Sequence, residues 1–208
     1  MITFYHAPYS RSTNVLALLL AMEKLEAVDL RLVDVCRQDG TGQRDPANPH
    51  PEAKVPYLVV DGLGMRERTA MFHFLPEVFD SPLGRRLGDP DYPAYLSWLA
   101  YYGNVVEPVL VGQFGGFAQN PALLSAFRGA PEIAQNLRSA LAQGPFLLGD
   151  EYCAADLLLS SPFLFFPDFT PDDDLIRAWV ARCGAMPWVA EAAAHDEAAL
   201  AARAQLPA

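Results

Sequence analysis

The stretch that decides the fold is residues 54–62, which read Lys-Val-Pro-Tyr-Leu-Val-Val-Asp-Gly. Apolar residues 57–60, between a proline and an Asp-Gly turn, predict a short buried strand, and residues 63–66 are expected to return beside it. Residues 68–78 then have the apolar spacing of a helix. Because Pro56 has no N–H to give to a ladder, it marks the head of the strand, where the preceding backbone is free to meet another group, or it is simply a strand-leading proline. The stretch therefore predicts a strand, turn, strand, helix unit.

The residues before this stretch predict a second unit, strand, helix, strand. Residues 2–5 read as a short apolar strand, and a helix that Ser12 or Thr13 can cap follows through Lys24 with an almost wholly apolar interior. Residues 28–35 alternate in the manner of a strand, which should run parallel to the first because a helix joins them. A βαβ unit, a polar loop and a ββα unit follow one another in the order of a thioredoxin-like domain.

No strand pattern appears in the second half of the chain. Residues 81–92 are rich in Pro and Gly, with Arg85 and Arg86 between, and read as an exposed linker between domains at 1–80 and 93–208. Helical spacing recurs in the stretches 94–111, 122–142, 155–164, 173–183 and 188–203. The last of these, rich in alanine, is expected to be an ordinary surface helix. The expected fold is an α/β domain with a mixed four-stranded sheet, followed by an all-α domain.

Composition and charge are those of a globular protein. Of 208 residues, 51% are hydrophobic and 19% are charged, which is enough apolar material for a substantial core. The net charge is −10 and the isoelectric point is near 4.7, so neither nucleic acid nor an anionic membrane is expected as a partner. A local basic pocket for a small anion is compatible with this charge.

Cysteine and histidine spacing bears on the compartment and on metals. Cys36, Cys153 and Cys183 are odd in number and widely spaced, so they predict neither a disulfide framework nor a zinc site and fit a reducing compartment. The histidines have no metal-ligand spacing either, so no metal is expected. The chain reads directly as a strand rather than as a signal peptide, and its apolar runs fall short of the roughly 18 residues that span a bilayer. We expect a cytoplasmic protein.

Several anchors together carry a resemblance to a known family. These are residues 54–56 with the Asp-Gly turn, Glu67 before an apolar helix, residues 48–51 (Asn-Pro-His-Pro), residues 5–11, and residues 149–156. In this order and spacing they resemble the cytosolic glutathione S-transferases, in particular bacterial ones, over nearly the whole chain. The resemblance implies the glutathione transferase fold and a detoxification enzyme that activates the thiol of glutathione for attack on a small hydrophobic electrophile.

Glutathione is a tripeptide with two carboxylates, one ammonium and a thiol. Its site therefore needs a strand edge for the peptide hydrogen bonds, cations or amides for the carboxylates, an acid for the ammonium, and a hydrogen-bond donor for the thiolate. The resemblance implies that Val55, beside a cis Pro56, pairs its backbone with the cysteinyl part. It also implies that Glu67 takes the γ-glutamyl ammonium and that Lys54 lies near the glycyl carboxylate.

Arg68 is the chief departure from the family pattern, which usually has Ser at this position; Thr69 follows it, and we include both in the expected glutathione site. Arg68 can bind the γ-glutamyl carboxylate bidentately, or it can turn outward and leave the helix N-terminus to do so. A third reading is weak glutathione binding. The chain would then be a non-catalytic binding or regulatory protein of the same fold.

The group that donates a hydrogen bond to the thiolate is expected just after the first strand, where a helix N-terminus lowers the pKa of a nearby thiol. Ser10 is the first choice, and Ser12 or Tyr9 are the alternatives, whereas Tyr5 is expected to lie in the core. The hydroxyl would donate a hydrogen bond to the glutathione sulfur and so favour thiolate. In the simplest structural reading, Ser10 and Ser12 are only turn and cap residues.

In the second half of the chain, the resemblance implies an electrophile site between the domains that uses the helix with Tyr101 and Asn104. The candidate aromatics for this site are Tyr101, Tyr102, Phe114, Phe117, Phe165, Phe166 and Phe169. Because a helical aromatic is more often in the core than in a substrate wall, only some of them are expected to line it. Asp156 is expected to cap a helix structurally, by reaching back to the Cys153 amide.

The resemblance also implies a homodimer, with a two-fold contact through the helix after Glu67 and the helix from Ala94. A thiol-disulfide oxidoreductase is disfavoured, because no Cys-x-x-Cys follows the first strand.

Overall fold

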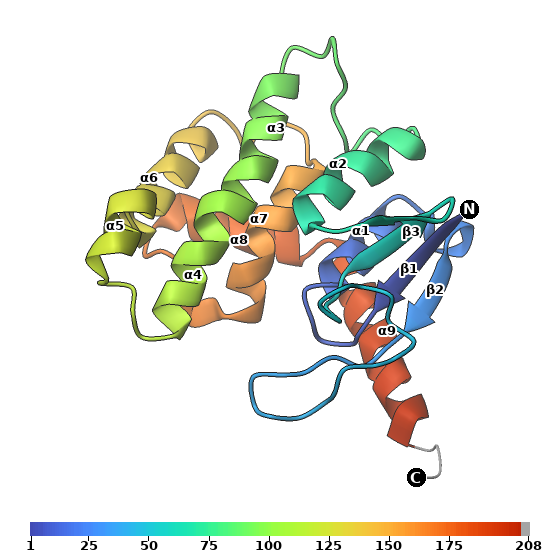
Figure 1. Ribbon diagram of the computed structural model, residues 1–208. Helices are drawn as coiled ribbons and strands as arrows, with labels where there is room; N and C mark the ends of the chain where they lie inside the picture. The colour runs from blue at the N-terminus through green and yellow to red at the C-terminus, as the bar shows by residue number, and fades with distance from the viewer. Residues whose placement is uncertain (205–208) are drawn as a thin grey trace. The chain divides into compact units, whose positions relative to one another are not determined.

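The structure is a computed structural model that describes residues 1–204 and forms two compact units, each described here by itself (Figure 1). Unit 1 contains residues 1–79 and the described residues from Met186 onward, and unit 2 contains Asp80–Ala185. The domain boundary expected within residues 81–92 stays a prediction. The last helix groups with residues 1–79, whereas the sequence placed it with the helical domain.

Unit 1 is built on a four-stranded mixed sheet with the order β2-β1-β3-β4. Its strands are β1 (Ile2–His6), β2 (Asp29–Leu32), β3 (Tyr57–Val60) and β4 (Leu63–Met65). β1 pairs with β2 in parallel and with β3 antiparallel, and β3 pairs with β4 antiparallel. The parallel pair follows from the crossover helix between β1 and β2, and the antiparallel pair from the Asp-Gly turn, where Gly62 has φ +85°. The expected thioredoxin-like order is confirmed.

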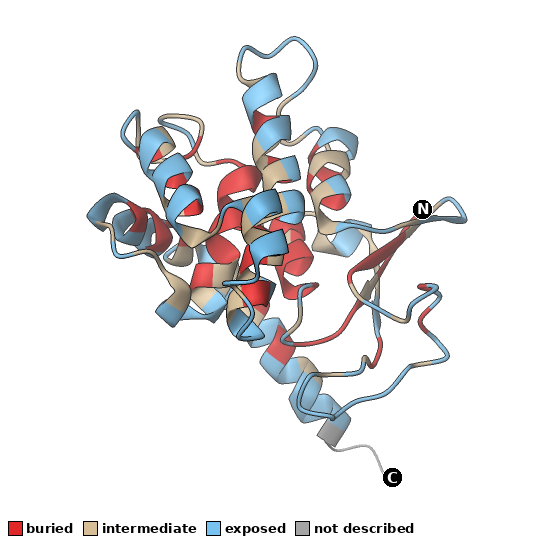
Figure 2. Cartoon of the chain, turned by 60° about the vertical axis from the view of Figure 1, so that its left-hand side comes forward, coloured by how far each residue is buried: buried red, intermediate tan, exposed pale blue. Residues whose placement is uncertain are grey.

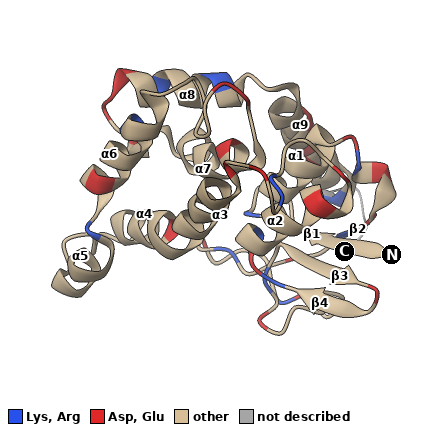
Figure 3. Cartoon of the chain, turned by 90° about the horizontal axis from the view of Figure 1, so that it is seen from above, with Lys and Arg blue, Asp and Glu red and all other residues tan. Residues whose placement is uncertain are grey.

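The helices of unit 1 are α1 (Thr13–Ala21), a 3₁₀ turn (Leu25–Ala27), α2 (Arg68–Val78) and α9 (Pro187–Ala204). α1 is buried along almost its whole length because its interior is apolar on every side. α1 and α2 lie on the same side of the sheet (Figure 3), and α9 packs along α1. Ser12 takes the N-cap position of α1, but its side chain makes no capping bond.

Unit 2 is all-helical apart from one isolated bridge within its described residues. Its elements are α3 (Tyr92–Tyr101), the π-helix η2 (Tyr102–Val106), α4 (Glu107–Phe114), α5 (Pro121–Phe127), α6 (Ala130–Leu141), α7 (Ala154–Phe165), the 3₁₀ turn η3 (Pro167–Phe169) and α8 (Asp174–Gly184). Trp179, Tyr95, Leu137 and Leu158 are fully buried and form the core of this unit; buried residues are red in Figure 2.

The sequence predicted one helix over 94–111 and one over 122–142, and the structure divides both. In the first, a π-helical turn interrupts the ladder before Pro108, which has no N–H to bond the carbonyl four residues earlier. In the second, Arg128 and Gly129 both have positive φ and end α5. No helix within residues 1–204 is long and apolar enough to cross a bilayer.

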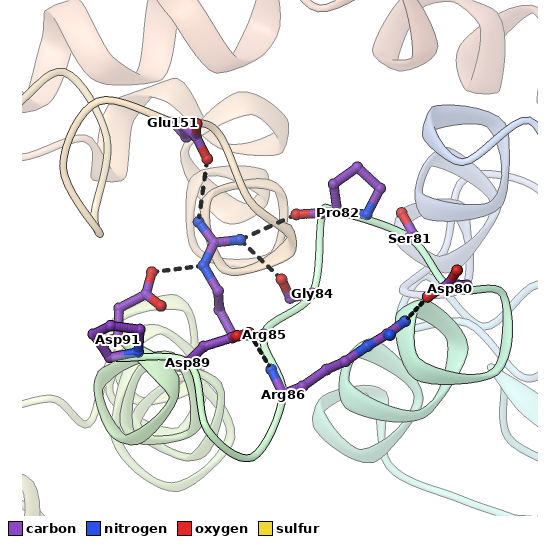
Figure 4. Close-up of a pocket in the computed structure, with 10 residues that line it drawn as sticks. Asp80, Ser81, Pro82, Gly84, Arg85, Arg86, Asp89, Asp91 and Glu151 are labelled. Atoms are coloured by element: carbon purple, nitrogen blue, oxygen red, sulfur yellow. Dashed lines mark hydrogen bonds and ion pairs between the residues drawn. The ribbon is translucent and has the colours of Figure 1, made fainter.

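The segment expected to be an exposed linker is partly anchored. The Arg85 side chain is only 11% exposed, and its Nε lies 2.6 Å from the Asp91 carboxylate. The same guanidinium donates to the carbonyls of Pro82 and Gly84 at 3.0 and 2.8 Å (Figure 4). The Arg85 guanidinium is thus held by the Asp91 carboxylate and by two backbone carbonyls. The open hollow that this segment lines around Arg85 is therefore a structural feature of the segment.

Asp156, near the start of α7, is completely buried and serves several donors at once. Its carboxylate accepts bonds from the Cys153 N–H at 3.1 Å, the Leu147 N–H at 2.9 Å and the Trp179 Nε1 at 2.8 Å. Burial raises the pKa of Asp156, although these hydrogen bonds oppose the shift. The residue therefore ties the start of α7 to α8 and to the segment before it.

Replacing Asp156 should destabilise unit 2. Asp156→Ala leaves three buried donors without an acceptor, which should lower the free energy of unfolding by at least about 3 kcal/mol. Thermal and urea unfolding of the variant would measure this cost. Asp150→Ala, which changes an exposed carboxylate on the same loop, is the matched control and should change stability by less than about 0.5 kcal/mol. Equal stability of the two variants would contradict the structural role.

Candidate functional site

The turn between β1 and α1 gathers most of the polar groups that lie buried in unit 1. β1 ends at His6 and α1 begins at Thr13, so residues 7–12 must reverse the chain within one short turn. Tyr9 adopts φ 50°, a left-handed conformation that is uncommon for a residue with a side chain. The half-buried Ser10 and the fully buried Ser12 follow on this turn.

The three hydroxyl candidates of the sequence lie in this turn, and Ser10 and Ser12 are in contact. Their Oγ atoms are 2.7 Å apart, and the Ser12 N–H donates to the Ser10 Oγ at 3.1 Å. The Ser10 hydroxyl can also donate to the Ala7 carbonyl at 2.7 Å. Because Ser12 is 0% exposed, only Ser10 of the two serines can touch a ligand.

Tyr9 is 43% exposed, but its hydroxyl makes its hydrogen bond to α9 rather than to Ser10 or Ser12. It donates to the Glu197 carboxylate at 3.3 Å. Partial burial and the negative charge of Glu197 raise the pKa of Tyr9 above its ordinary value. The Tyr9 hydroxyl is therefore engaged by a carboxylate of α9.

Two residues that the sequence did not place in the site complete this cluster. The His6 Nδ1 lies 2.7 Å from the Ser12 Oγ, and its Nε2 lies 2.8 Å from the Asp196 Oδ1. His6 is 1% exposed and Asp196 is 0% exposed. The Ser12 hydroxyl is thus engaged with His6, which explains why it does not cap α1.

Asp196 belongs to α9 and accepts two more hydrogen bonds on its second oxygen. The Thr13 hydroxyl donates at 2.6 Å and the Tyr9 N–H donates at 2.7 Å. Burial alone would raise the pKa of Asp196, but the bonds from His6, Thr13 and Tyr9 outweigh it and lower the pKa below its ordinary value. Asp196 is therefore an ionised carboxylate inside the unit.

Arg37 is a further residue that the sequence did not indicate. Its Nη2 donates to the Pro8 carbonyl at 2.9 Å, so a guanidinium lies against the outside of the β1–α1 turn. A second contact, from its Nη1 to the Tyr9 carbonyl at 3.5 Å, places this cation against the backbone that precedes Ser10.

The segment before β3 presents the backbone of Val55. The Val55–Pro56 peptide bond is cis, as the resemblance implied. The buried Asn48 donates to the Lys54 carbonyl at 3.1 Å, and the Glu52 N–H donates to the His50 Nδ1 at 2.9 Å. Burial lowers the pKa of His50, consistent with a neutral ring that accepts this bond. These contacts fix the loop that leads to Val55.

Glu67, Arg68 and Thr69 lie where β4 passes into α2. Glu67 occupies the N-cap position with φ 69° and ψ 117°, and its side chain is exposed and makes no capping bond. Arg68 and Thr69 form the first turn of α2 and are half-buried. A strained backbone at a helix N-terminus with amides in its first turn is an arrangement found at anion-binding sites.

Lys54 is 70% exposed and forms an ion pair with Glu52. This pair lowers the pKa of the Glu52 carboxyl, chiefly through the hydrogen bond from Lys54. An exposed pair of this kind contributes little to stability, so Lys54 can exchange its partner for a ligand carboxylate at little cost.

In unit 2, Tyr101 and Asn104 lie on consecutive elements. Tyr101 ends α3, and its hydroxyl accepts a bond from the Asn136 side chain at 2.9 Å. Asn104 lies in the π-helix η2 and is exposed. π-helical turns occur frequently at functional sites, which agrees with a role for this segment.

The other aromatic candidates of unit 2 separate into one core residue and one surface cluster. Tyr102 is 3% exposed, so its ring packs in the core, as expected from the sequence for some of these aromatics. Phe114, Phe166 and Phe169 contact one another with ring centroids 5.5 to 6.3 Å apart. Phe114, Phe117, Phe165 and Phe166 are each close to half exposed. Unit 2 thus carries an exposed aromatic cluster.

Charges are dispersed over both units. Figure 3 shows Lys and Arg scattered among several elements rather than gathered in one stripe in that view. Within the part of the chain that the structure describes, no group of three His, Cys, Asp or Glu side chains is arranged to hold a metal ion.

The sequence alone has no match among protein-family models or curated proteins. The structure, however, is similar to solved glutathione transferases. A glutathione S-transferase from Actinobacillus pleuropneumoniae has 20% identity and a TM-score of 0.74, with 95% of this chain and 93% of that chain covered. A glutathione transferase from Methylococcus capsulatus has 22% identity and a TM-score of 0.69, with 95% and 99% covered.

A sphingomonad glutathione S-transferase, solved in complex with glutathione, has 21% identity and a TM-score of 0.70, with 94% of this chain and 98% of that chain covered. These similarities extend over nearly the full length of each chain, across both the sheet and the helices. The chain therefore has the glutathione transferase fold.

Proposed function

We propose that this protein is a cytoplasmic glutathione transferase that binds glutathione along unit 1 and activates its thiol for attack on a small hydrophobic electrophile. The observation that carries the proposal is the presence, within one unit, of an accessible Ser10 hydroxyl on the β1–α1 turn and a fixed Val55 backbone beside cis Pro56. The glutathione complex of a structural neighbour supports the same ligand.

Each group of the tripeptide has a partner in the proposed site. Val55 offers its backbone to the cysteinyl part, and Glu67 offers an exposed carboxylate to the γ-glutamyl ammonium. Arg68, Thr69 and the first amides of α2 are proposed to hold the γ-glutamyl carboxylate, and Lys54 the glycyl carboxylate. Ser10 then donates a hydrogen bond to the sulfur.

The second substrate is proposed to be apolar. Tyr101 and Asn104 are the residues we assign to it, and the exposed aromatic cluster of unit 2 shows that this unit has apolar surface to offer. We also propose a homodimer with a two-fold contact through α2 and α3, as the family resemblance implies.

Calorimetric titration with glutathione tests the proposal most directly. The wild-type protein should bind one tripeptide per chain with saturable heat. If the protein remains folded and gives no heat of binding up to millimolar glutathione, the site is degenerate. The chain is then a non-catalytic protein of the same fold, a reading that the arginine at position 68 also allows.

Ser10→Ala should lower turnover with a generic electrophile by roughly tenfold to a hundredfold, because the sulfur loses its thiolate donor. Glutathione affinity should change little, since the hydroxyl contributes mainly to the thiolate form. Steady-state kinetics and calorimetry on the same variant measure the two effects. Tyr9→Phe is the matched control, and a larger loss of turnover in that variant would assign the role to Tyr9.

Arg68→Ala distinguishes the two roles of this residue. If the guanidinium pairs with the γ-glutamyl carboxylate, its loss should weaken glutathione binding by roughly 1.5–3 kcal/mol, or about tenfold to a hundredfold. If the helix N-terminus alone binds that carboxylate, Arg68→Ala should have little effect and Arg68→Ser should strengthen binding.

Arg66→Ala removes an exposed guanidinium two residues earlier and serves as the control for the change in net charge. Calorimetry of the three variants, with thermal unfolding to exclude a loss of stability, decides between the two roles. Unchanged or tighter binding in Arg68→Ala rejects a functional arginine.

A further inference from the structure

A continuous chain of hydrogen-bonding groups leads from Ser10 into the interior of unit 1. It runs from the Ser10 Oγ to the Ser12 Oγ at 2.7 Å, from there to the His6 Nδ1 at 2.7 Å, and from the His6 Nε2 to the Asp196 Oδ1 at 2.8 Å. We call these four residues the hydroxyl chain. Its inner members, Ser12, His6 and Asp196, are each at most 1% exposed, whereas Ser10 is half-buried and accessible.

The hydrogen-bond partners allow the chain to be polarised toward the interior. An ionised Asp196 can only accept, so the His6 Nε2 carries the hydrogen, and when the ring carries no second proton its Nδ1 is an acceptor. The Ser12 hydroxyl then donates to Nδ1. The Ser12 Oγ accepts from the Ala7 N–H at 3.1 Å and can accept the Ser10 hydroxyl proton as well. In this arrangement the hydroxyls of Ser10 and Ser12 both point inward, although each also lies within hydrogen-bond distance of the Ala7 carbonyl, at 2.7 and 3.2 Å.

We propose that His6, backed by Asp196, accepts the thiol proton of bound glutathione through the hydroxyls of Ser10 and Ser12. The proposal deepens the proposed function and rests on it for the identity of the thiol. His6 and Asp196 touch no substrate, so they are positioning residues that act through Ser12 and Ser10. Buried Ser12 cannot itself attack a substrate, which separates this arrangement from a hydrolytic triad.

The proton balance of this step is closed. The S–H bond breaks and a new O–H bond forms on Ser10, while the original Ser10 proton moves to Ser12 and the original Ser12 proton moves to the His6 Nδ1. The products are a thiolate and an imidazolium that donates from both nitrogens, to Asp196 and to Ser12. The bonds from His6 through Ser12 to Ser10 then point outward, while the His6 Nε2 still donates to Asp196, so the Ser10 hydroxyl ends as a donor to the thiolate, which is the role already assigned to it.

The first experiment needs no glutathione. Ser10→Cys places a thiol at the outer end of the hydroxyl chain, and its alkylation rate by iodoacetamide at neutral pH reports its thiolate fraction. Burial raises the pKa of Cys153 and raises that of Cys183 to about 12, so these two thiols should not react. Cys36 is exposed, so Cys36→Ser is used as the background.

In this background, adding His6→Gln should lower the alkylation rate about tenfold or more, because the amide cannot accept a proton. Glu197→Gln removes the adjacent acid of α9, which lies outside the chain, and should change the rate by less than about twofold. Equal rates with and without His6→Gln in folded protein overturn the proposal. If His6→Gln does not fold, Ser12→Ala interrupts the chain at one oxygen and must give the same loss.

The second experiment compares wild-type protein with His6→Gln in the presence of glutathione. His6→Gln should retain glutathione affinity by calorimetry but lose the ultraviolet absorbance of the bound thiolate. A retained thiolate signal overturns the proposal, since Ser10 would then act without His6. If the wild type binds no glutathione while the alkylation result holds, the proposed function fails and the hydroxyl chain stands.

Discussion

The geometry of the candidate site depends on one buried carboxylate. A carboxylate removed from water costs several kcal/mol unless hydrogen bonds from the protein replace its hydration. The 0% exposed Asp196 receives these bonds from His6, the Tyr9 N–H and the Thr13 hydroxyl. The three donors come from the end of β1, the following turn and the first residue of α1, so one side chain of α9 holds three segments in register.

The need of the buried Asp196 carboxylate for hydrogen-bond donors accounts for the conformation of the β1–α1 turn. The left-handed φ of Tyr9 costs about 1–2 kcal/mol for a residue with a Cβ. The same conformation lets the Tyr9 N–H bond the Asp196 carboxylate at 2.7 Å, and a hydrogen bond to a charged group contributes about 1.5–3 kcal/mol. The strain is thus offset locally. A second tie, from the Arg203 guanidinium to the buried Asp34 at 2.7 Å, fixes α9 further along its length.

Sequence patterns recovered the parts of the fold that are decided locally. β3 and α2 begin and end at the expected residues, because a proline, an Asp-Gly turn and apolar spacing set their bounds within a few positions. The helix over 94–111 was only partly right, since a π-helical turn depends on how Pro108 is accommodated by the packed helix rather than on periodicity. Ser10 lies, as expected, on the turn after β1.

His6 and Asp196, which the sequence did not place in the site, could not be found from local sequence patterns. His6 and Asp196 are 190 residues apart, and one short sequence window never contains both. A faint signal exists in α9, where the buried Ala192 precedes Asp196 by four residues and so shares its face. An acid on the buried stripe of an alanine-rich helix predicts a polar partner in the interior, but it does not say which histidine or hydroxyl that partner is.

The two ends of the proposed glutathione site differ in how firmly their groups are held, and the difference follows from what each must do. Lys54 and Glu67 are exposed, and the Lys54–Glu52 pair is a surface ion pair that a ligand carboxylate can replace with little loss. At the thiol end, Ser12, His6 and Asp196 are buried and their bonds cannot be exchanged for water. Binding a charged tripeptide requires groups that change partners, whereas moving a proton requires donors and acceptors already in place, because reorganising them would add to the barrier. The burial of the hydroxyl chain is therefore the feature that separates a site able to activate a thiol from one able only to bind it.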